Sequence, residues 1–180
     1  MFKKRFAPYT LGLLLLAAGA SADPSHHGAS PPVASAILHA ADGSPAGTAT
    51  LLVRGKGLEL HLDARGLPEG EHGAHIHAVG SCEAPGFASA GSHLNPFGKV
   101  HGMMNPQGHH LGDLPNLVVG PDGTGTLTVQ LEGKQAEIEP FLFDSDGAAI
   151  VIHATADDLR SDPSGNSGSR LVCGVLEKAG

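Results

Sequence analysis

The sequence predicts an all-β domain, an antiparallel Greek-key sandwich or flattened barrel of eight strands with two long functional loops. Two observations favour this fold class. Short segments rich in leucine and β-branched residues recur between turn residues, and apolar residues nowhere keep a helical period. The eight predicted strands cover residues 33–40, 47–53, 57–64, 72–79, 116–119, 124–131, 148–154 and 170–177.

The amino-terminal segment 1–22 has the features of a secretory signal peptide. Three basic residues precede an apolar run at 11–20, and Ala-Ser-Ala at 20–22 forms a small-x-small cleavage pattern. The run is too short to span a bilayer, and no cysteine follows it to carry a lipid. We therefore expect an exported chain, in the periplasm or the medium, with no membrane anchor.

Export sets the charge of the mature chain. The full sequence has 11 basic and 18 acidic residues, and loss of the three basic leader residues leaves 8 against 18, a formal charge of −10. Such a chain is a poor partner for nucleic acid and for anionic membranes. Residues 23–32 are small, polar and proline-ended, and we expect a flexible arm whose His26 and His27 either capture metal or belong to a solvated tail. Residues 33–180 then form a single domain.

Turns and two long loops connect the predicted strands. Residues 41–46 and 120–123 are short turns, and the second, Gly-Pro-Asp-Gly, joins two strands as a hairpin. Residues 80–115 and 161–169 are rich in glycine, proline and asparagine. Long loops on a compact β scaffold are usually functional, so these two loops are the expected place of a site.

The two cysteines are expected to form a disulfide. Cys82 and Cys173 are the only thiols of the chain, and export places them in an oxidising compartment. In the loop-entropy model a closed loop of this length contributes about 4–5 kcal/mol. Two free, buried thiols are the alternative.

Histidines are concentrated in the fourth predicted strand and the loop after it. Because side chains alternate along a strand, His75 and His77 project together while Ile76 faces the core. Two such imidazoles can converge on a metal ion, although an exposed histidine pair has the same spacing. The loop that follows carries His93, His101, His109, His110 and Asp113.

Three histidines and one aspartate of this loop suit a tetrahedral zinc site. His93, His101, His110 and Asp113 follow one another at spacings of eight, nine and three residues. They offer nitrogen and oxygen donors without thiolate, as zinc accepts, and a closed metal site would supply folding energy to a loop with little core of its own. A merely solvated, polar loop is the alternative. His153, at the end of a β-branched strand, would by itself be a core residue rather than a ligand.

Taken together, these segments resemble the copper,zinc superoxide dismutases over residues 33–177. The motifs that carry the resemblance are HGAHIHAVGSC, GSHLNP, VHG, HHLGD, VIHATADDL and GNSGSRLVCGV, and they occur in the order of the family. The resemblance implies an eight-stranded antiparallel Greek-key barrel. It also implies one copper and one zinc per chain.

The resemblance assigns roles to the residues of these motifs. The implied copper ligands are His75, His77, His93 and His153, and the implied zinc ligands are His93, His101, His110 and Asp113. His93 would bridge both metals and deliver a proton as peroxide forms. Asp157 would hydrogen-bond the non-liganding nitrogens of His75 and His101, and Cys82 and Cys173 would be the family's disulfide.

The implied activity is dismutation of superoxide to dioxygen and hydrogen peroxide. Arg170 would pair with the anion beside the copper. The lysine that often helps to draw superoxide toward the copper is absent here, since the region reads SDPSGNSG. Steering would then fall on Arg170 with help from Lys99, Lys134 or Arg160, among which the sequence does not choose. Ala74 also departs from the family, in which many members have an aromatic residue there.

Other functions and assemblies remain open at this stage. A copper- or zinc-binding or metallochaperone module on the same fold would be expected to lack some of the copper ligands, and none is missing. An adhesive β-sandwich without metal would leave the two ligand clusters unexplained. Monomer and homodimer are both compatible with the sequence. The other histidines are expected to have structural or surface roles: His39, His61, His72 and His109.

Overall fold

The structure is a computed structural model that describes residues 31–179, together with Met1 and Lys3. Most of the predicted leader lies outside this part of the chain, as does the arm at 23–30 with His26 and His27.

The described residues form ten strands, all paired antiparallel, with one α-helix and one short 3-10 helix. The helices are α1 (Gln135–Leu142) and η1 (Ala88–Ala90). The strands are β1 (Ala34–Ala40), β2 (Pro45–Arg54), β3 (Gly57–Arg65), β4 (Gly70–His72), β5 (Ala74–His77), β6 (Leu117–Val119), β7 (Thr124–Gln130), β8 (Ala149–His153), β9 (Arg170–Val175) and β10 (Glu177–Lys178).

The strands form one sheet that curls into a barrel. Its order is β4-β6-β7-β3-β2-β1-β9-β8-β5, with β10 beside β1. β4 and β5 stand at the two ends of this path although only Gly73 separates them in the chain, so the ends of the sheet meet there. The β3–β4 and β7–β8 connections join strands that are not neighbours, as in a Greek key. The predicted fold class is confirmed.

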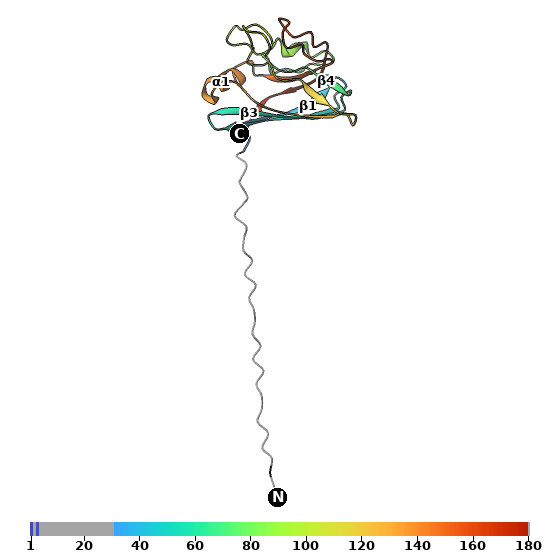
Figure 1. The fold of residues 1–180 in the computed structure, drawn as a ribbon, viewed down its shortest axis with the longest axis vertical. Coiled ribbons are helices and arrows are strands. Elements are labelled where there is room, and N and C mark those ends of the chain that lie inside the picture. The colour runs from blue at the N-terminus through green and yellow to red at the C-terminus, as the bar shows by residue number, and fades with distance from the viewer. Residues whose placement is uncertain (2, 4–30, 180) are drawn as a thin grey trace.

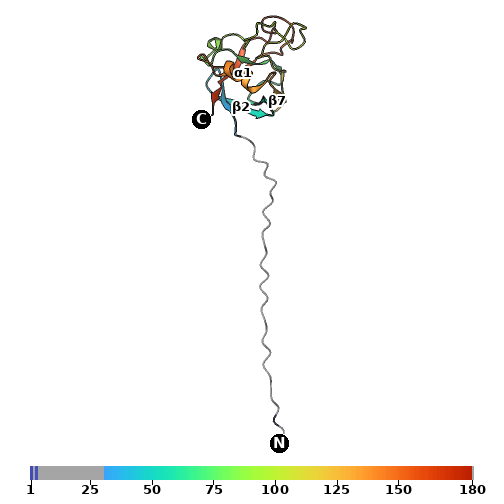
Figure 2. The same ribbon diagram turned by 90° about the vertical axis from the view of Figure 1, so that its left-hand side faces the viewer.

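The barrel places the long loops together on one side. β1 and β3 form the wall on the side opposite the loops, and α1 lies at one end of the barrel, as Figure 1 shows. Figure 2 faces the end that carries α1, and the loops again lie across the barrel from β2. Residues 80–115 and 154–169 are therefore carried by a common rigid scaffold.

Alternating side chains fill the barrel. In β3 the leucines Leu58, Leu60 and Leu62 are no more than 1% exposed, whereas the residues between them face outward or are only partly covered. Burying each leucine contributes about 1.5–3 kcal/mol. The strand register is thereby fixed, because a slip of one residue would expose the whole row.

Three features differ from the expectations. The predicted strand 170–177 is divided at Leu176 into β9 and β10. The predicted strand 72–79 is divided at Gly73, because the chain pairs with β6 before this residue and with β8 after it. Helix α1 was not predicted. It has only eight residues with two buried apolar side chains, Ile138 and Leu142, so it shows no sustained period. Glu137 closes its amino-terminal end, because its carboxylate accepts the Lys134 backbone N–H at 3.3 Å and the Lys134 ammonium at 2.6 Å.

Within the described part of the chain, neither helix combines the length and the apolar character that crossing a bilayer requires.

Candidate metal centre

Three of the predicted copper ligands lie on two neighbouring strands. His75 and His77 are on β5, and His153 ends β8, which pairs with β5. A register shift between Ile152 and His153 changes the direction of the side chain at the end of β8. All three imidazoles are no more than 4% exposed, and Ile76 between the first two is fully buried in the barrel core, as expected for alternating side chains.

The first long loop folds back along the free edge of β5. Isolated bridges pair His75 with Asp113 and His77 with His93, and the backbone of Ile76 bonds with Gly112 and Leu94, each at 2.8 Å. A Cβ on Gly112 would stand 2.1 Å from the Ile76 carbonyl oxygen, so only glycine permits this approach. The loop thus brings its ligands directly onto the strand that carries His75 and His77.

One group of four buried histidines surrounds a common point. A ring nitrogen of each lies within 4.8 Å of those of the others. Four ring nitrogens of this group have no hydrogen-bond partner in the described structure: His75 Nδ1, His77 Nε2, His93 Nε2 and His153 Nε2. A buried nitrogen without a partner is costly, so four of them in one place indicate an atom that accepts all four lone pairs.

The opposite ring nitrogens are held by acceptors. His75 Nε2 lies 2.6 Å from an Asp157 oxygen, His77 Nδ1 2.9 Å from the Gly91 carbonyl and His153 Nδ1 3.2 Å from the Gly168 carbonyl. Because carbonyl and carboxylate oxygens accept, these nitrogens carry the proton and the inward nitrogens keep their lone pairs. Each imidazole is thereby held in a tautomer that can bind metal.

Burial keeps these imidazoles neutral. It lowers the pKa of His75 to about 4, that of His77 to about 2 and that of His153 to about 3, against an ordinary value of 6.5. Protons therefore compete weakly for the inward nitrogens at neutral pH. Such a site is ready for a cation before any cation arrives.

A second group gathers around Asp113. The Nδ1 atoms of His93, His101 and His110 lie 2.9, 3.1 and 3.1 Å from Asp113 Oδ1. In a tetrahedron with bonds of about 2.0 Å the ligand atoms are about 3.3 Å apart, so these four atoms have nearly the spacing of a zinc coordination shell. The other oxygen, Asp113 Oδ2, accepts backbone N–H groups of Gly102 at 2.8 Å and His110 at 3.1 Å.

Two buried carboxylates give this second group a negative character. Burial opposes the charge on Asp113, but hydrogen bonds from His101 and His93 outweigh it and hold the pKa of this carboxyl well below its usual range. Burial likewise lowers the pKa of His101, yet hydrogen bonds to Asp113 and Asp157 raise it to about 9. Without metal, a proton on His101 therefore offsets part of the negative charge of the two carboxylates at neutral pH.

Asp157 links the two groups. Its carboxylate lies 2.6 Å from His75 Nε2 and 3.0 Å from His101 Nε2, with a side chain that is fully buried. His75 belongs to the first group and His101 to the second, and His93 belongs to both, with Nε2 on one side and Nδ1 on the other.

The donor sets fit copper and zinc. Four imidazoles without thiolate suit copper, and three imidazoles with one carboxylate suit zinc. The four unpartnered nitrogens of the first group and the near-tetrahedral spacing of the second are the observations that support this fit.

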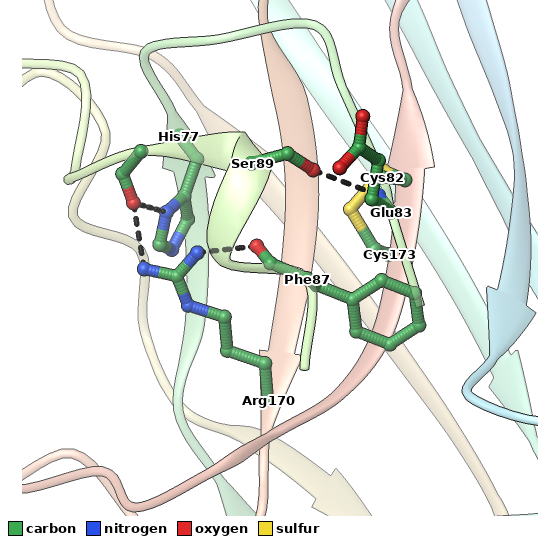
Figure 3. Close-up of a disulfide and its surroundings, with 8 residues drawn as sticks. His77, Cys82, Glu83, Phe87, Ser89, Arg170 and Cys173 are labelled. Atoms are coloured by element: carbon green, nitrogen blue, oxygen red, sulfur yellow. Dashed lines mark hydrogen bonds between the residues drawn. A yellow bond between two sulfur atoms is a disulfide. The ribbon is translucent and has the colours of Figure 1, made fainter. Parts of the chain in front are cut away.

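Arg170 stands beside His77 of the first group and near the disulfide, as Figure 3 shows. Its guanidinium donates to the Phe87 carbonyl at 2.5 Å and to the Gly91 carbonyl at 2.6 Å, and the latter oxygen also accepts from His77. Arg170 pairs with His153 across β8 and β9. Burial lowers the pKa of the Arg170 guanidinium from its ordinary value. A positive charge is thus fixed next to the four histidines.

The predicted disulfide is confirmed. Cys82 and Cys173 are bonded, with their Cα atoms 5.7 Å apart. The bond ties the start of the first long loop to β9, which also carries Arg170 (Figure 3). Loop, strand and arginine therefore form one connected unit.

The other predicted cations lie on the surface. Lys99 and Arg160 are exposed, and Lys134 is paired with Glu137 at 2.6 Å, which reduces its field. Among the remaining histidines, His72 is buried and contacts the carbonyls of His153 and Pro68, at 2.7 and 2.9 Å. The other three have local polar contacts: His39 with Gly43, His61 with Glu59 and Thr128, and His109 with His110 and Glu132.

The sequence analysis missed the backbone groups that orient the site. The Gly91 and Phe87 carbonyls hold Arg170, and Asp162 accepts the His101 N–H at 2.7 Å. A backbone carbonyl leaves no signal in the sequence. Asp162 was visible only as part of a polar loop.

Known proteins of the same kind match the chain over most of its length. The family model described as copper/zinc superoxide dismutase matches residues 46–176. A copper-zinc superoxide dismutase of Caulobacter vibrioides is 40% identical over 148 residues, which are 80% of this chain and 85% of the relative. One from Aquifex aeolicus is 39% identical over 175 residues, 91% of this chain and 93% of the relative.

Solved structures agree with these relatives. The crystal structure of a superoxide dismutase-like protein from Bacillus subtilis has a TM-score of 0.74 at 40% identity, covering 79% of this chain and 97% of that chain. The copper/zinc superoxide dismutase from Brucella abortus has a TM-score of 0.64 at 30% identity, covering 79% and 98%.

Proposed function

The chain belongs to the copper/zinc superoxide dismutase family, and from this premise we propose that it dismutates superoxide with a copper ion and a zinc ion joined through His93. The chain is thus an oxidoreductase whose substrate is superoxide. The observation that carries the proposal is the convergence of four buried, unpartnered imidazole nitrogens on one point. A β-domain without metal would have no reason to maintain them.

The proposal assigns copper to His75, His77, His93 and His153, and zinc to His93, His101, His110 and Asp113. When bound, copper supplies one-electron redox cycling, taking an electron from one superoxide and giving it to a second, which zinc cannot do. Every other step rests on side chains of the chain itself.

Arg170 is the proposed anion-binding residue. Two carbonyl acceptors hold its guanidinium, so the charge does not have to be reorganised when an anion arrives. The formal charge of −10 expected for the mature chain repels superoxide at long range, which makes a local positive charge necessary.

His93 is the proposed proton carrier. Its Nδ1 is held by Asp113 at 2.9 Å, which fixes the ring, while Nε2 points away from that contact and has no hydrogen-bond partner among the described residues. Nε2 is therefore the atom at which a proton would be taken up and delivered as peroxide forms.

A metal-reconstitution experiment tests this function. Chain stripped of metal, then loaded with zinc alone or with copper and zinc, is mixed with superoxide generated by pulse radiolysis. We expect rapid dismutation only with copper present. If the protein loaded with copper and zinc removes superoxide no faster than the zinc-only form, the proposed enzyme activity is contradicted. That result would favour a metal-binding or metallochaperone role.

We also propose that the chain is exported, to the periplasm or the medium, and begins near Asp23 after cleavage. The basic, apolar and small residues of 1–22 support this proposal. Amino-terminal sequencing of the protein from the periplasmic fraction and from the medium tests it, and an uncleaved amino terminus in the cytoplasm would contradict it.

A further inference from the structure

We propose that Asn116 is a positioning residue for both metal sites, acting through the backbone of Asp157. This inference rests on the proposed metal sites. Asn116 lies just before β6, and its amide hydrogen-bonds none of the seven proposed ligand residues. It hydrogen-bonds Asp157, the residue that connects the two groups.

The amide of Asn116 makes two hydrogen bonds to the backbone of one residue. Its Nδ2 donates to the Asp157 carbonyl, and its Oδ1 accepts the Asp157 N–H, both at 2.9 Å. A side chain that hydrogen-bonds both the N–H and the carbonyl of one residue fixes the position and orientation of that residue, because each bond restricts the other. The direction of the Asp157 carboxylate is set accordingly.

Asn116 is itself held rigidly. Three residues before it, Asp113 forms a backbone bridge to His75. Directly after it, Leu117 pairs with His72 in the β4–β6 ladder, and Leu114 between these points is 1% exposed. Asn116 therefore lies between two fixed points, a bridge to β5 at His75 and a strand pair to β4 at His72.

The other side of Asp157 is closed by Gly165. A Cβ on Gly165, which has φ +64, would stand 1.8 Å from Asp157 Oδ1. The Leu159 N–H also donates to this oxygen, at 2.6 Å. With its backbone held by Asn116 and its carboxylate enclosed, Asp157 keeps its oxygens directed at His75 Nε2 and His101 Nε2 as well as at the Leu159 N–H.

The consequence is a link between the two metal sites that begins at Asn116. Groups that orient metal-bound histidines typically change metal affinity 10–100-fold when removed. Asn116 acts one bond further away than Asp157, so we expect an effect at the lower end of this range, about tenfold.

Two variants of Asn116 and one control test the proposal. Asn116→Ala removes both hydrogen bonds. Asn116→Asp keeps the shape and one acceptor but replaces the donor with an oxygen that faces the Asp157 carbonyl. The control is Asn95→Ala. Asn95 Nδ2 donates to the Lys99 carbonyl at 2.8 Å and Asn95 Oδ1 accepts the Lys99 N–H at 3.0 Å, but Asn95 does not contact Asp157.

The measurements are metal release and the copper spectrum. Zinc release from loaded protein into a chromogenic chelator should be about tenfold faster in both Asn116 variants and unchanged in Asn95→Ala. The Cu(II) electron paramagnetic resonance spectrum should change in the Asn116 variants, because the His75 ring loses its fixed orientation, and stay the same in the control.

Three outcomes overturn the inference. The Asn116 variants could match the parent in zinc release and spectrum, they could lose only thermal stability while both metal readouts stay unchanged, or Asn95→Ala could show the same changes. If the unsubstituted protein binds neither copper nor zinc, the proposed function itself is wrong. Metal analysis of that protein shows this before any variant is made.

Discussion

Replacing Asp113 by alanine should damage the fold even when no metal is bound. Asp113 Oδ2 accepts the backbone N–H groups of Gly102 and His110, at 2.8 and 3.1 Å, in a site where Asp113 is 4% exposed. Each buried N–H left without an acceptor costs about 1–3 kcal/mol, so the metal-free Asp113→Ala chain should lose about 2–6 kcal/mol. Domains of this kind have about 5–15 kcal/mol in total.

The assay is urea unfolding of protein stripped of metal by chelation, followed by zinc titration. Asp113→Asn serves as the second variant, because it keeps an acceptor oxygen and should lose less stability while still binding zinc more weakly. Asp122→Ala is the matched control. Asp122 also accepts a backbone N–H, that of Thr124 at 3.1 Å, but on an exposed turn, so its loss should change the midpoint little.

Hydrogen exchange locates the damage. Backbone amides of residues 80–115 should exchange faster in Asp113→Ala, because the carboxylate that ties Gly102 and His110 is gone. An Asp113→Ala chain that keeps the parent's unfolding midpoint and still binds one zinc would refute the reasoning.

Three further predictions concern the charge, the disulfide and the pH dependence. Arg170→Glu should lower the dismutation rate while metal content is retained, and the parent's decline in rate with added salt should flatten or invert; full copper with an unchanged rate and salt dependence would remove the steering role. Replacing Cys82 and Cys173 by serine should cost about 4–5 kcal/mol in urea unfolding, since the bond closes a loop of 91 residues, and an unchanged midpoint would contradict this. The metal-free chain should lose stability as pH falls from 6.5 toward 4. The depressed pKa values of His75 and His153 keep both imidazoles neutral in the folded chain, whereas the same imidazoles take up protons in the unfolded chain. A free energy of unfolding that stays level over this pH range would contradict the assigned burial.

The strands and the ligand clusters were largely predictable because their signals are local. Alternation in a segment such as GLELHLDA, residues 57–64, requires only a half-buried strand, and β3 has that pattern. The spacing of His75 and His77 put both on one face of a strand, and the structure brings them together with His93 and His153. Export likewise pointed to the disulfide that the structure contains.

The parts that escaped prediction depend on contacts between distant segments. Helix α1 is short and has Lys134 at its amino-terminal cap, a residue type that gives no usual capping signal. The break at Gly73 arises because the chain changes its partner strand there. Asn116 could be assigned a role only when Asp157, 41 residues away in the chain, was found against its amide.

Metal stoichiometry tests the central claim most directly. The claim is that two metal ions share His93 between a group of four histidines and a group of three histidines with Asp113. Protein purified from cells grown with ample copper and zinc, and measured by elemental analysis, should contain about one copper and one zinc per chain. Zinc without copper, or a single metal ion per chain, would contradict the account.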